Sequence, residues 1–212
     1  MRSDHRQVVL VVDIQADFTE YRNGSLAVPG TGRQYVEKVV ERTHHYRTTG
    51  VPVIATRDHH PVDHISFFTN HRGAKFLDVI QVEDRKQTLW PPHCVQGTTG
   101  AEILLPADLI TAVISKGEHP KYDSYSAFKD DGGHETGLRR LLDELGAKEI
   151  IIYGLTTDFC VRFTALHARE AGLSATVLLD LSRGVTPEGT HSAVEEMRSA
   201  GATIAAGAED FL

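Results

Sequence analysis

The sequence V-V-L-V-V at residues 8–12, followed by Asp13, decides the fold, because similar runs recur along the chain. They read V-P-V-I-A at 51–55, A-V-I-S at 112–115, I-I-I-Y at 150–153, A-T-V-L-L at 175–179 and, more weakly, A-T-I-A at 202–205. These runs are continuously apolar and do not alternate with polar residues. This pattern is typical of strands that helices cover on both faces.

Helical segments lie between the apolar runs, and each is followed by a glycine, the residue at which helices commonly end. They span residues 33–49, 135–145, 159–171 and 187–200. Strands that alternate with helices imply right-handed crossovers and a mostly parallel sheet. We therefore predict a single α/β domain over residues 1–212, a three-layer α/β/α sandwich with a mostly parallel six-stranded sheet.

Composition excludes several classes of protein. The 212 residues are 41% hydrophobic and 24% charged, with a net charge of -7 from 22 basic and 29 acidic residues. This balance predicts no binding to nucleic acid or to a membrane surface. The N-terminus lacks the apolar stretch of a secretory signal, so we expect a cytoplasmic protein. With two cysteines, Cys94 and Cys160, we expect one working thiol and no disulfide framework.

The segment from Phe67 to Trp90 fits this alternation poorly. We interpret it as a long loop with short structure of its own. Long loops in compact enzymes often surround functional sites.

One carboxylate and three imidazoles predict a divalent metal site. Asp58, His60 and His64 lie in T-R-D-H-H-P-V-D-H at 56–64, and His93 follows a Pro-Pro pair. Alternate residues of an extended chain share a face, so Asp58 and His60 point the same way. Such a donor set suits a divalent cation. Chance clustering among the 12 histidines is the alternative.

Four predicted strands end close to a chemically useful residue: Asp13, Asp58, Lys116 or Cys160. Ligands of open α/β sheets bind outside the carboxyl ends of the strands, so a parallel sheet gathers these side chains at one edge. Taken singly, Cys160 reads as a core thiol, Asp13 as a cap and Lys116 as a surface lysine. Their shared placement favours a catalytic site.

Cys160 is the predicted nucleophile. It lies in the first turn of a helix that begins near Asp158, where the helix dipole stabilises a thiolate. We expect Lys116 to lower the pKa of the thiol further and Asp13 to take its proton. Cys94 is the rival nucleophile, but it follows a loop and neighbours a metal-ligand candidate. We interpret Cys94 as structural.

With these residues located, the chain resembles nicotinamidases, also called pyrazinamidases, among the isochorismatase-like cysteine hydrolases, which have a Rossmann-like fold. The resemblance covers nearly the whole length. Its landmarks are V-D-I-Q-A-D-F at 12–18, T-R-D-H-H-P-V-D-H-I-S-F at 56–67, W-P-P-H-C-V-Q-G-T at 90–98, S-K-G at 115–117, D-S-Y-S-A-F at 123–128 and G-L-T-T-D-F-C-V at 154–161.

The resemblance assigns roles to particular positions. It implies a catalytic triad of Asp13, Lys116 and Cys160, and a metal site of Asp58, His60, His64 and His93. It implies a cis peptide bond between Leu155 and Thr156, with the N–H groups of Thr156 and Cys160 forming an oxyanion hole. Many relatives carry Ala where this chain has Thr156. It also implies that Phe18, Trp90 and Tyr125 enclose a pyridine ring.

The activity that the resemblance implies is hydrolysis of nicotinamide to nicotinate and ammonia through a cysteine thioester, with pyrazinamide as a further substrate. It implies one divalent metal ion, zinc, iron or manganese, and a homodimer is the expected assembly. One alternative is another cysteine amidohydrolase of the superfamily that acts on a non-pyridine amide. A second is a metal-binding or nucleotide-binding module without hydrolysis, although P-G-T-G-R-Q-Y at 29–35 lacks the third glycine of a nucleotide loop.

Overall fold

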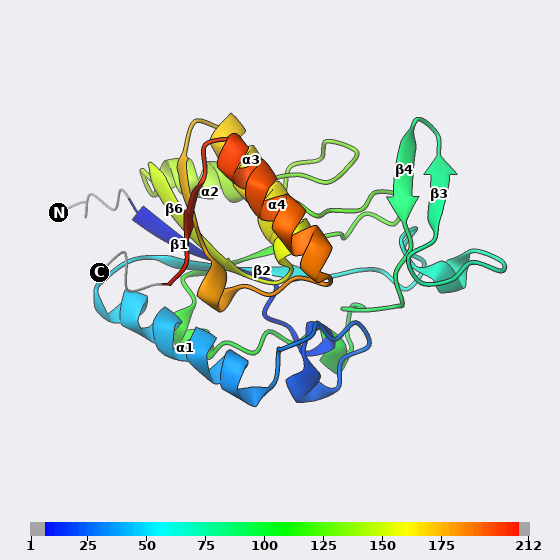
Figure 1. Ribbon diagram of the computed structural model, residues 1–212, viewed down its shortest axis with the longest axis horizontal. Coiled ribbons are helices and arrows are strands. Elements are labelled where there is room, and N and C mark those ends of the chain that lie inside the picture. Colours follow the sequence, from blue (N-terminus) through cyan, green and yellow to red (C-terminus); the bar gives the residue numbers. More distant parts are fainter. Residues whose placement is uncertain (1–6, 208–212) are drawn as a thin grey trace.

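The computed structural model describes residues 7–207, and its centre is a six-stranded sheet in the order β5-β2-β1-β6-β7-β8 (Figure 1). All of its strand pairs are parallel. The strands are β1 (Gln7–Val12), β2 (Val53–Asp58), β5 (Ala112–Lys116), β6 (Glu149–Gly154), β7 (Ser174–Leu178) and β8 (Thr203–Ala205). The predicted α/β fold is confirmed.

Helices cover both faces of the sheet and complete three layers (Figure 1). One face carries α1 (Arg33–Thr48), and the other carries α2 (Leu138–Glu144), α3 (Arg162–Glu170) and α4 (Pro187–Ser199). Strand β1 shows why its run is apolar throughout. Val8 and Leu10 pack in the core beneath α2, α3 and α4, whereas Val9 and Val11 pack in the core beneath α1.

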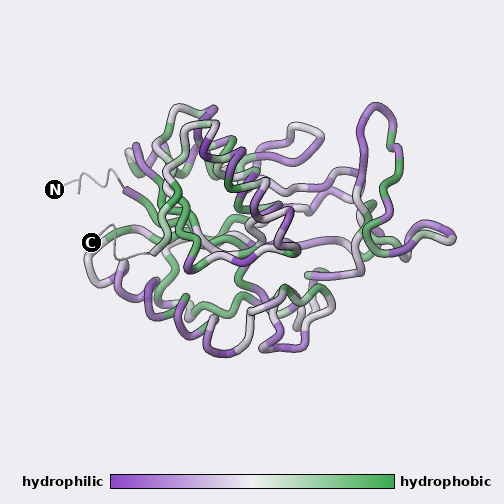
Figure 2. Tube along the Cα trace, in the orientation of Figure 1, coloured by the Kyte–Doolittle hydropathy of each residue, from purple (hydrophilic) through white to green (hydrophobic). Residues whose placement is uncertain are grey.

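The apolar strands therefore lie inside the molecule, and the polar sides of the helices face outward (Figure 2). Every residue from Val8 to Val12 has an exposed fraction of 0%. Burial of a Val or Leu side chain contributes roughly 1.5–3 kcal/mol, so this strand alone anchors both layers.

The boundaries of some elements differ from the prediction. The strand predicted at 51–55 is β2, and it extends to Asp58, so this carboxylate belongs to the sheet itself. The helix predicted from 135 begins only at Leu138, after Gly137 with φ of 93°. The helix predicted from 159 starts earlier, with a π-helical turn at Thr157–Val161 that leads into α3.

The segment from Phe67 to Trp90 leaves the sandwich and returns to it, as expected of a long loop with its own short structure. It contains the antiparallel pair β3 (Val79–Val82) and β4 (Arg85–Thr88), which projects from one end of the molecule (Figure 1). Phe67 and Trp90, at its two ends, form a β-bridge. The two ends of this segment therefore lie side by side in the fold.

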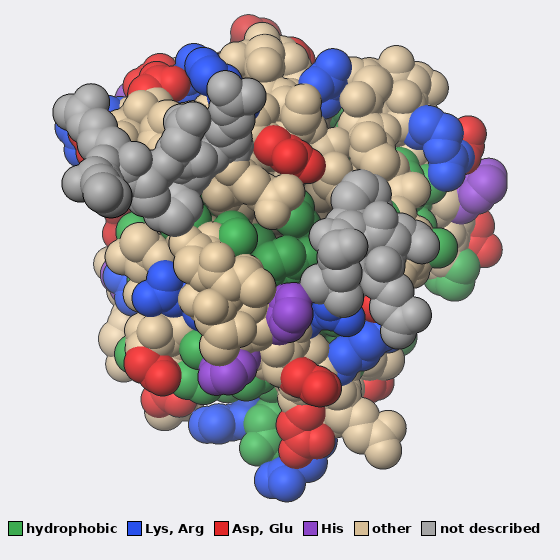
Figure 3. All heavy atoms as spheres, turned by 90° about the vertical axis from the view of Figure 1, so that its left-hand side faces the viewer, with side chains coloured by type: hydrophobic (Ala, Val, Ile, Leu, Met, Phe, Trp, Pro, Cys, Tyr) green, Lys and Arg blue, Asp and Glu red, His purple; other side chains and the backbone are tan. Residues whose placement is uncertain are grey.

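Acidic and basic side chains are interspersed on the surface shown in Figure 3. Within residues 7–207, no helix is both long enough and apolar enough to cross a bilayer.

Candidate active site

Four neighbouring strands bring the predicted reactive side chains to one edge of the sheet. Asp58 and Lys116 are register partners at the carboxyl ends of β2 and β5. Asp13 directly follows β1, and Cys160 lies in the first turn after β6. The chain order reverses between β1 and β6, which is where open α/β sheets bind their ligands.

The ammonium group of Lys116 contacts the other three side chains. Its Nζ lies 2.9 Å from Asp13 Oδ2 and 3.3 Å from Cys160 Sγ, contacts Asp58 Oδ1, and donates to the carbonyl of Ser124 at 3.0 Å. Burial by itself lowers the pKa of Lys116, but the two carboxylates outweigh it and raise the pKa well above its ordinary value. The ammonium group therefore stays charged.

Thr56 on β2 orients Asp13. The Thr56 hydroxyl donates to Asp13 Oδ1 at 2.6 Å and accepts from the Asp13 amide at 3.1 Å. Asp13 has a φ of 48°, a left-handed conformation that is uncommon outside glycine. The turn after β1 is thus held from the neighbouring strand, with the carboxylate directed at Lys116.

The direction of the pKa shift of the Cys160 thiol differs from the prediction. Burial raises the pKa of the Cys160 thiol well above its ordinary value, and Lys116 offsets only part of this effect. The expected lowering of the thiol pKa is therefore wrong, because the side chain is buried and Lys116 also pairs with Asp13 and Asp58. Burial also raises the pKa of Asp13, against the opposing effect of Lys116. Asp13 is thus suited to accept the thiol proton during attack.

The potential metal-ligand atoms of three residues lie close together: those of Asp58, His60 and His93. Asp58 Oδ2 lies 3.6 Å from His60 Nε2 and 3.8 Å from His93 Nε2. The Nδ1 atoms of the two rings hydrogen-bond the carbonyls of Gly117 at 2.9 Å and Pro91 at 2.8 Å, which leaves each Nε2 as the ligand atom. Donors bound at about 2.1 Å to a tetrahedral ion are roughly 3.4 Å apart. The three residues therefore fit one divalent cation.

Two of these groups have charge states that suit a metal, whereas Asp58 outweighs the effect of burial and raises the pKa of His60, so metal binding there competes with a proton. Although burial opposes it, Lys116 and His60 lower the pKa of Asp58, so this carboxylate is ionised. Burial, aided by His60, lowers the pKa of His93 to about 4. An ionised carboxylate and a neutral imidazole are the forms that bind a cation.

His64 is placed differently from the other predicted ligands. Its ring lies against that of His60, with centroids 4.2 Å apart, but both of its nitrogens have partners. Nδ1 lies 2.7 Å from the Ser66 hydroxyl and Nε2 lies 3.2 Å from the carbonyl of Tyr122. The structure therefore brings His64 to the site without joining it to the group of Asp58, His60 and His93.

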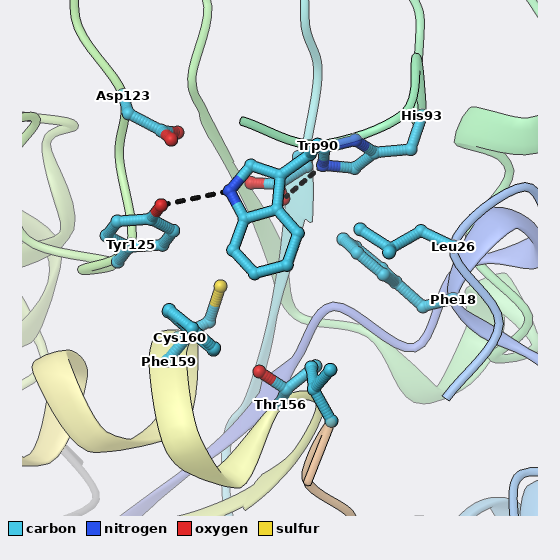
Figure 4. A pocket seen from close by; sticks show the side chains of 11 residues that line it. Phe18, Leu26, Trp90, His93, Asp123, Tyr125, Thr156, Phe159 and Cys160 are labelled. Atoms are coloured by element: carbon cyan, nitrogen blue, oxygen red, sulfur yellow. Dashed lines mark hydrogen bonds and ion pairs between the residues drawn. The ribbon is translucent and has the colours of Figure 1, made fainter. Parts of the chain in front are cut away.

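A cavity opens onto the sulfur of Cys160 (Figure 4). The predicted aromatic residues Phe18, Trp90 and Tyr125 all line it. Trp90 Nε1 donates to the Tyr125 hydroxyl at 3.0 Å, and the Trp90 ring packs edge-to-face on Phe159 with centroids 4.9 Å apart. The remaining lining residues are Leu26, Asp58, His93, Asp123, Thr156 and Val185. The cavity is thus lined mainly by aromatic and aliphatic side chains, with Asp58 and Asp123 as its acidic members.

The loop before Cys160 has the predicted backbone. The peptide bond between Leu155 and Thr156 is cis. Within residues 7–207 the Thr156 amide has no hydrogen-bond acceptor, and it lies at the cavity with Cys160. Asp158 secures the loop by accepting from the amides of Val185 at 3.0 Å and Thr186 at 3.1 Å.

Sequence reasoning missed two groups of residues at the site. The side chain of Gln15 accepts from the Asp58 amide at 2.7 Å and donates to the Asp58 carbonyl at 2.8 Å. Asp123 lines the cavity, and Gln87 of β4 donates to it at 2.8 Å. Asp123 belongs to the landmark D-S-Y-S-A-F, which was a usable signal, whereas nothing in the sequence distinguishes Gln87.

Cys94 faces away from the cavity. Its side chain is fully buried in the core beneath α1, and its amide donates to Asp17 Oδ2 at 2.7 Å. Burial raises the pKa of this thiol well above its ordinary value, so it stays protonated. These contacts agree with a structural cysteine.

A family model described as the isochorismatase domain matches residues 7–209. A nicotinamidase of Acinetobacter baylyi is 39% identical over 205 residues, which cover 95% of this chain and 92% of that protein. The match therefore extends over nearly all of both chains.

Two solved structures also align with nearly the whole chain. A nicotinamidase pyrazinamidase of Acinetobacter baumannii aligns with a TM-score of 0.87 and 34% identity, covering 98% of this chain and 99% of that one. A pyrazinamidase of Pyrococcus horikoshii, solved in complex with zinc, aligns with a TM-score of 0.77 and 37% identity, covering 94% and 98%.

Proposed function

Because the chain belongs to the isochorismatase family, we propose that it is a nicotinamidase, which hydrolyses nicotinamide to nicotinate and ammonia and accepts pyrazinamide as well. The observation that carries the proposal is the contact of Lys116 with both Asp13 and Cys160 beside an aromatic cavity. A thiol, a base and a flat apolar space are what attack on an aromatic carboxamide requires.

The reaction begins at Cys160. Asp13 accepts the proton of the thiol as the sulfur bonds to the carboxamide carbon. The amides of Thr156 and Cys160 donate to the oxyanion, and Lys116 balances the negative charge. Asp13 then passes its proton to the nitrogen of the substrate, the C–N bond breaks, and ammonia leaves a thioester on Cys160.

Water completes the cycle. Asp13, again ionised, takes a proton from a water molecule that attacks the thioester carbon. The same two amides stabilise the second oxyanion. The C–S bond then breaks, the sulfur of Cys160 regains a proton from Asp13, and nicotinic acid leaves and loses its proton to water to become nicotinate.

We propose Asp58, His60 and His93 as metal ligands, with His64 beside them as the fourth predicted member. When bound, a divalent metal ion supplies a fixed positive charge that anchors the pyridine nitrogen and orients the ring. The donors suit zinc, iron or manganese, and the Pyrococcus horikoshii relative was solved with zinc.

The test is ammonia release from nicotinamide by the purified protein, before and after chelator treatment, with benzamide as the matched substrate that lacks the ring nitrogen. We expect release from nicotinamide, loss of most of it with chelator, and recovery when metal is restored. Benzamide should react far more slowly. No ammonia from nicotinamide in metal-replete protein would favour another amidohydrolase of the superfamily.

Three expectations from the sequence stay predictions: a single domain, a homodimer and a cytoplasmic location. Light scattering after size exclusion tests the second, because a dimer has twice the 23.4 kDa mass of the chain. Limited proteolysis tests the first, since a single domain should resist internal cleavage except at the tip of the β3–β4 hairpin.

A further inference from the structure

Asp123 is a buried acid at the cavity that the proposed mechanism does not use. Its exposed fraction is 4%, and it lines the same cavity as Asp58, His93 and Cys160. Figure 4 shows its carboxylate at the edge of the cavity, beside the hydroxyl of Tyr125. It therefore lies where a bound ligand or ion can reach it.

The charge of Asp123 is unusual because it lacks a cationic partner. Asp13 and Asp58 both pair with Lys116. Within the described part of the chain, no Lys, Arg or His forms an ion pair with Asp123 at 4.0 Å or less. Its two oxygens accept one hydrogen bond each, from Gln87 Nε2 at 2.8 Å and from the Ser124 amide at 2.9 Å. A carboxylate has about four acceptor positions, and buried charges are normally paired or bound to metal.

The nearest candidate partners are imidazoles. One oxygen of Asp123 and one nitrogen each of His60 and His64 lie within 4.8 Å of one another. His60 also belongs to the group with Asp58 and His93. His60 Nδ1 is paired with the carbonyl of Gly117, so only Nε2 is available as a ligand atom. The two groups share His60 as a common member and therefore cannot each bind a separate ion through His60.

Gln87 holds Asp123 in this place. It has an exposed fraction of 1% although it lies on β4 of the projecting hairpin. Its Nε2 donates both to Asp123 and to the carbonyl of Thr88 at 2.8 Å, while its Oε1 has no partner within residues 7–207. The amide is therefore oriented to donate to Asp123, and the orientation leaves a buried acceptor unsatisfied.

We propose that Asp123, positioned by Gln87, is an additional acidic member of the metal centre and raises the affinity of the site for a divalent cation. The inference extends the proposed function, because it concerns the same metal centre. The carboxylate acts either on the ion or on a water bound to it, since a bridging water is nearly as favourable as a direct contact. The hairpin thereby contributes to the site through Gln87.

The test measures Zn²⁺ affinity by competition with a chromophoric chelator, in the absence of substrate. We expect Asp123→Asn to weaken Zn²⁺ binding by about 10- to 100-fold, the usual effect of removing a partner of a metal centre. Gln87→Met keeps the volume of the side chain and removes its donor, so it should weaken binding by a smaller factor. Asp131→Asn is the matched control, because it removes a carboxylate that adds to the acidic charge around Asp123 but does not line the cavity.

Near-UV circular dichroism shows whether each variant is folded. Should Asp123→Asn fail to fold, Gln87→Met carries the test, with weaker Zn²⁺ binding supporting the inference. Wild-type affinity in the folded variants would overturn it, and so would an equal loss in Asp131→Asn, which would indicate a general charge effect. If the protein failed to hydrolyse nicotinamide, the proposed function would be refuted. The comparison of Zn²⁺ affinities would still test the role of Asp123, because it uses no substrate.

Discussion

The two sides of the cavity are built in different ways. On one side, Asp13, Asp58 and Lys116 stand at the ends of neighbouring parallel strands, and their contacts follow from strand register. On the other side, Trp90 and Asp123 come from outside the sheet, and each side chain has one hydrogen bond to another segment: Trp90 donates to Tyr125, and Asp123 accepts from Gln87. In the proposed mechanism the sheet side carries the chemistry, and the loop side shapes the space for the ring.

This difference predicts how substitutions act. A change on the sheet side removes a reacting group or leaves a buried charge unpaired, which is costly. A change on the loop side alters fit, which costs about 1 kcal/mol for a lost hydrogen bond. Five predictions test this contrast.

The largest effect is expected for Cys160→Ala. It removes the proposed nucleophile, so ammonia release should fall to background while Zn²⁺ binding is retained. Cys94→Ala is the matched control, because it removes the other thiol from the opposite core. The control should keep turnover and lose only about 1–2 kcal/mol of stability. Wild-type-like activity in Cys160→Ala would end the nucleophile assignment.

Lys116→Met should abolish turnover and also destabilise the fold. It leaves the buried carboxylates of Asp13 and Asp58 without their cation, which costs about 3–5 kcal/mol. Lys38→Met removes an exposed lysine that pairs with Asp180 at 3.0 Å, and it should cost less than about 1 kcal/mol. Urea unfolding of both variants measures the difference. Equal stabilities would show that the Lys116 pair contributes nothing to the fold.

The two histidines that lie against each other should differ in their effect on metal binding. His60→Ala removes a free Nε2 that faces Asp58, so Zn²⁺ affinity should fall by more than 100-fold. His64→Ala removes a ring whose nitrogens already have partners, and it should cost no more than about tenfold. Chelator competition gives both values. A larger loss in His64→Ala would make it the principal ligand.

On the loop side, Trp90→Phe should raise KM for nicotinamide about tenfold with a smaller change in kcat, because it removes the hydrogen bond to Tyr125 and part of the ring surface. Phe76→Leu is the matched control. Phe76 contacts Trp90, with ring centroids 5.9 Å apart, but does not line the cavity. Steady-state kinetics separate KM from kcat, and a loss confined to kcat would place Trp90 in the chemistry.

The same contrast explains what the sequence predicted. Continuous apolar runs located the strands, and the rule on strand ends placed Asp13 and Lys116 with Cys160. The raised pKa of Cys160 could not be predicted, because it depends on burial and on the sharing of one ammonium. The contact of Gln87 with Asp123 joins residues 36 positions apart across two loops, and no local pattern encodes such a pair.

The smallest effect is expected for Thr156→Ala, although Thr156 lies at the cavity. Among residues 7–207 its buried hydroxyl oxygen has no hydrogen-bond partner, so removing it costs no hydrogen bond. The proposed role belongs to the backbone N–H, which Ala retains. We therefore expect kcat within about twofold of wild type, since loss of an oxyanion donor would cost about 100-fold or more. A large fall in kcat would mean that the hydroxyl contacts the substrate and that the side chain contributes to the chemistry.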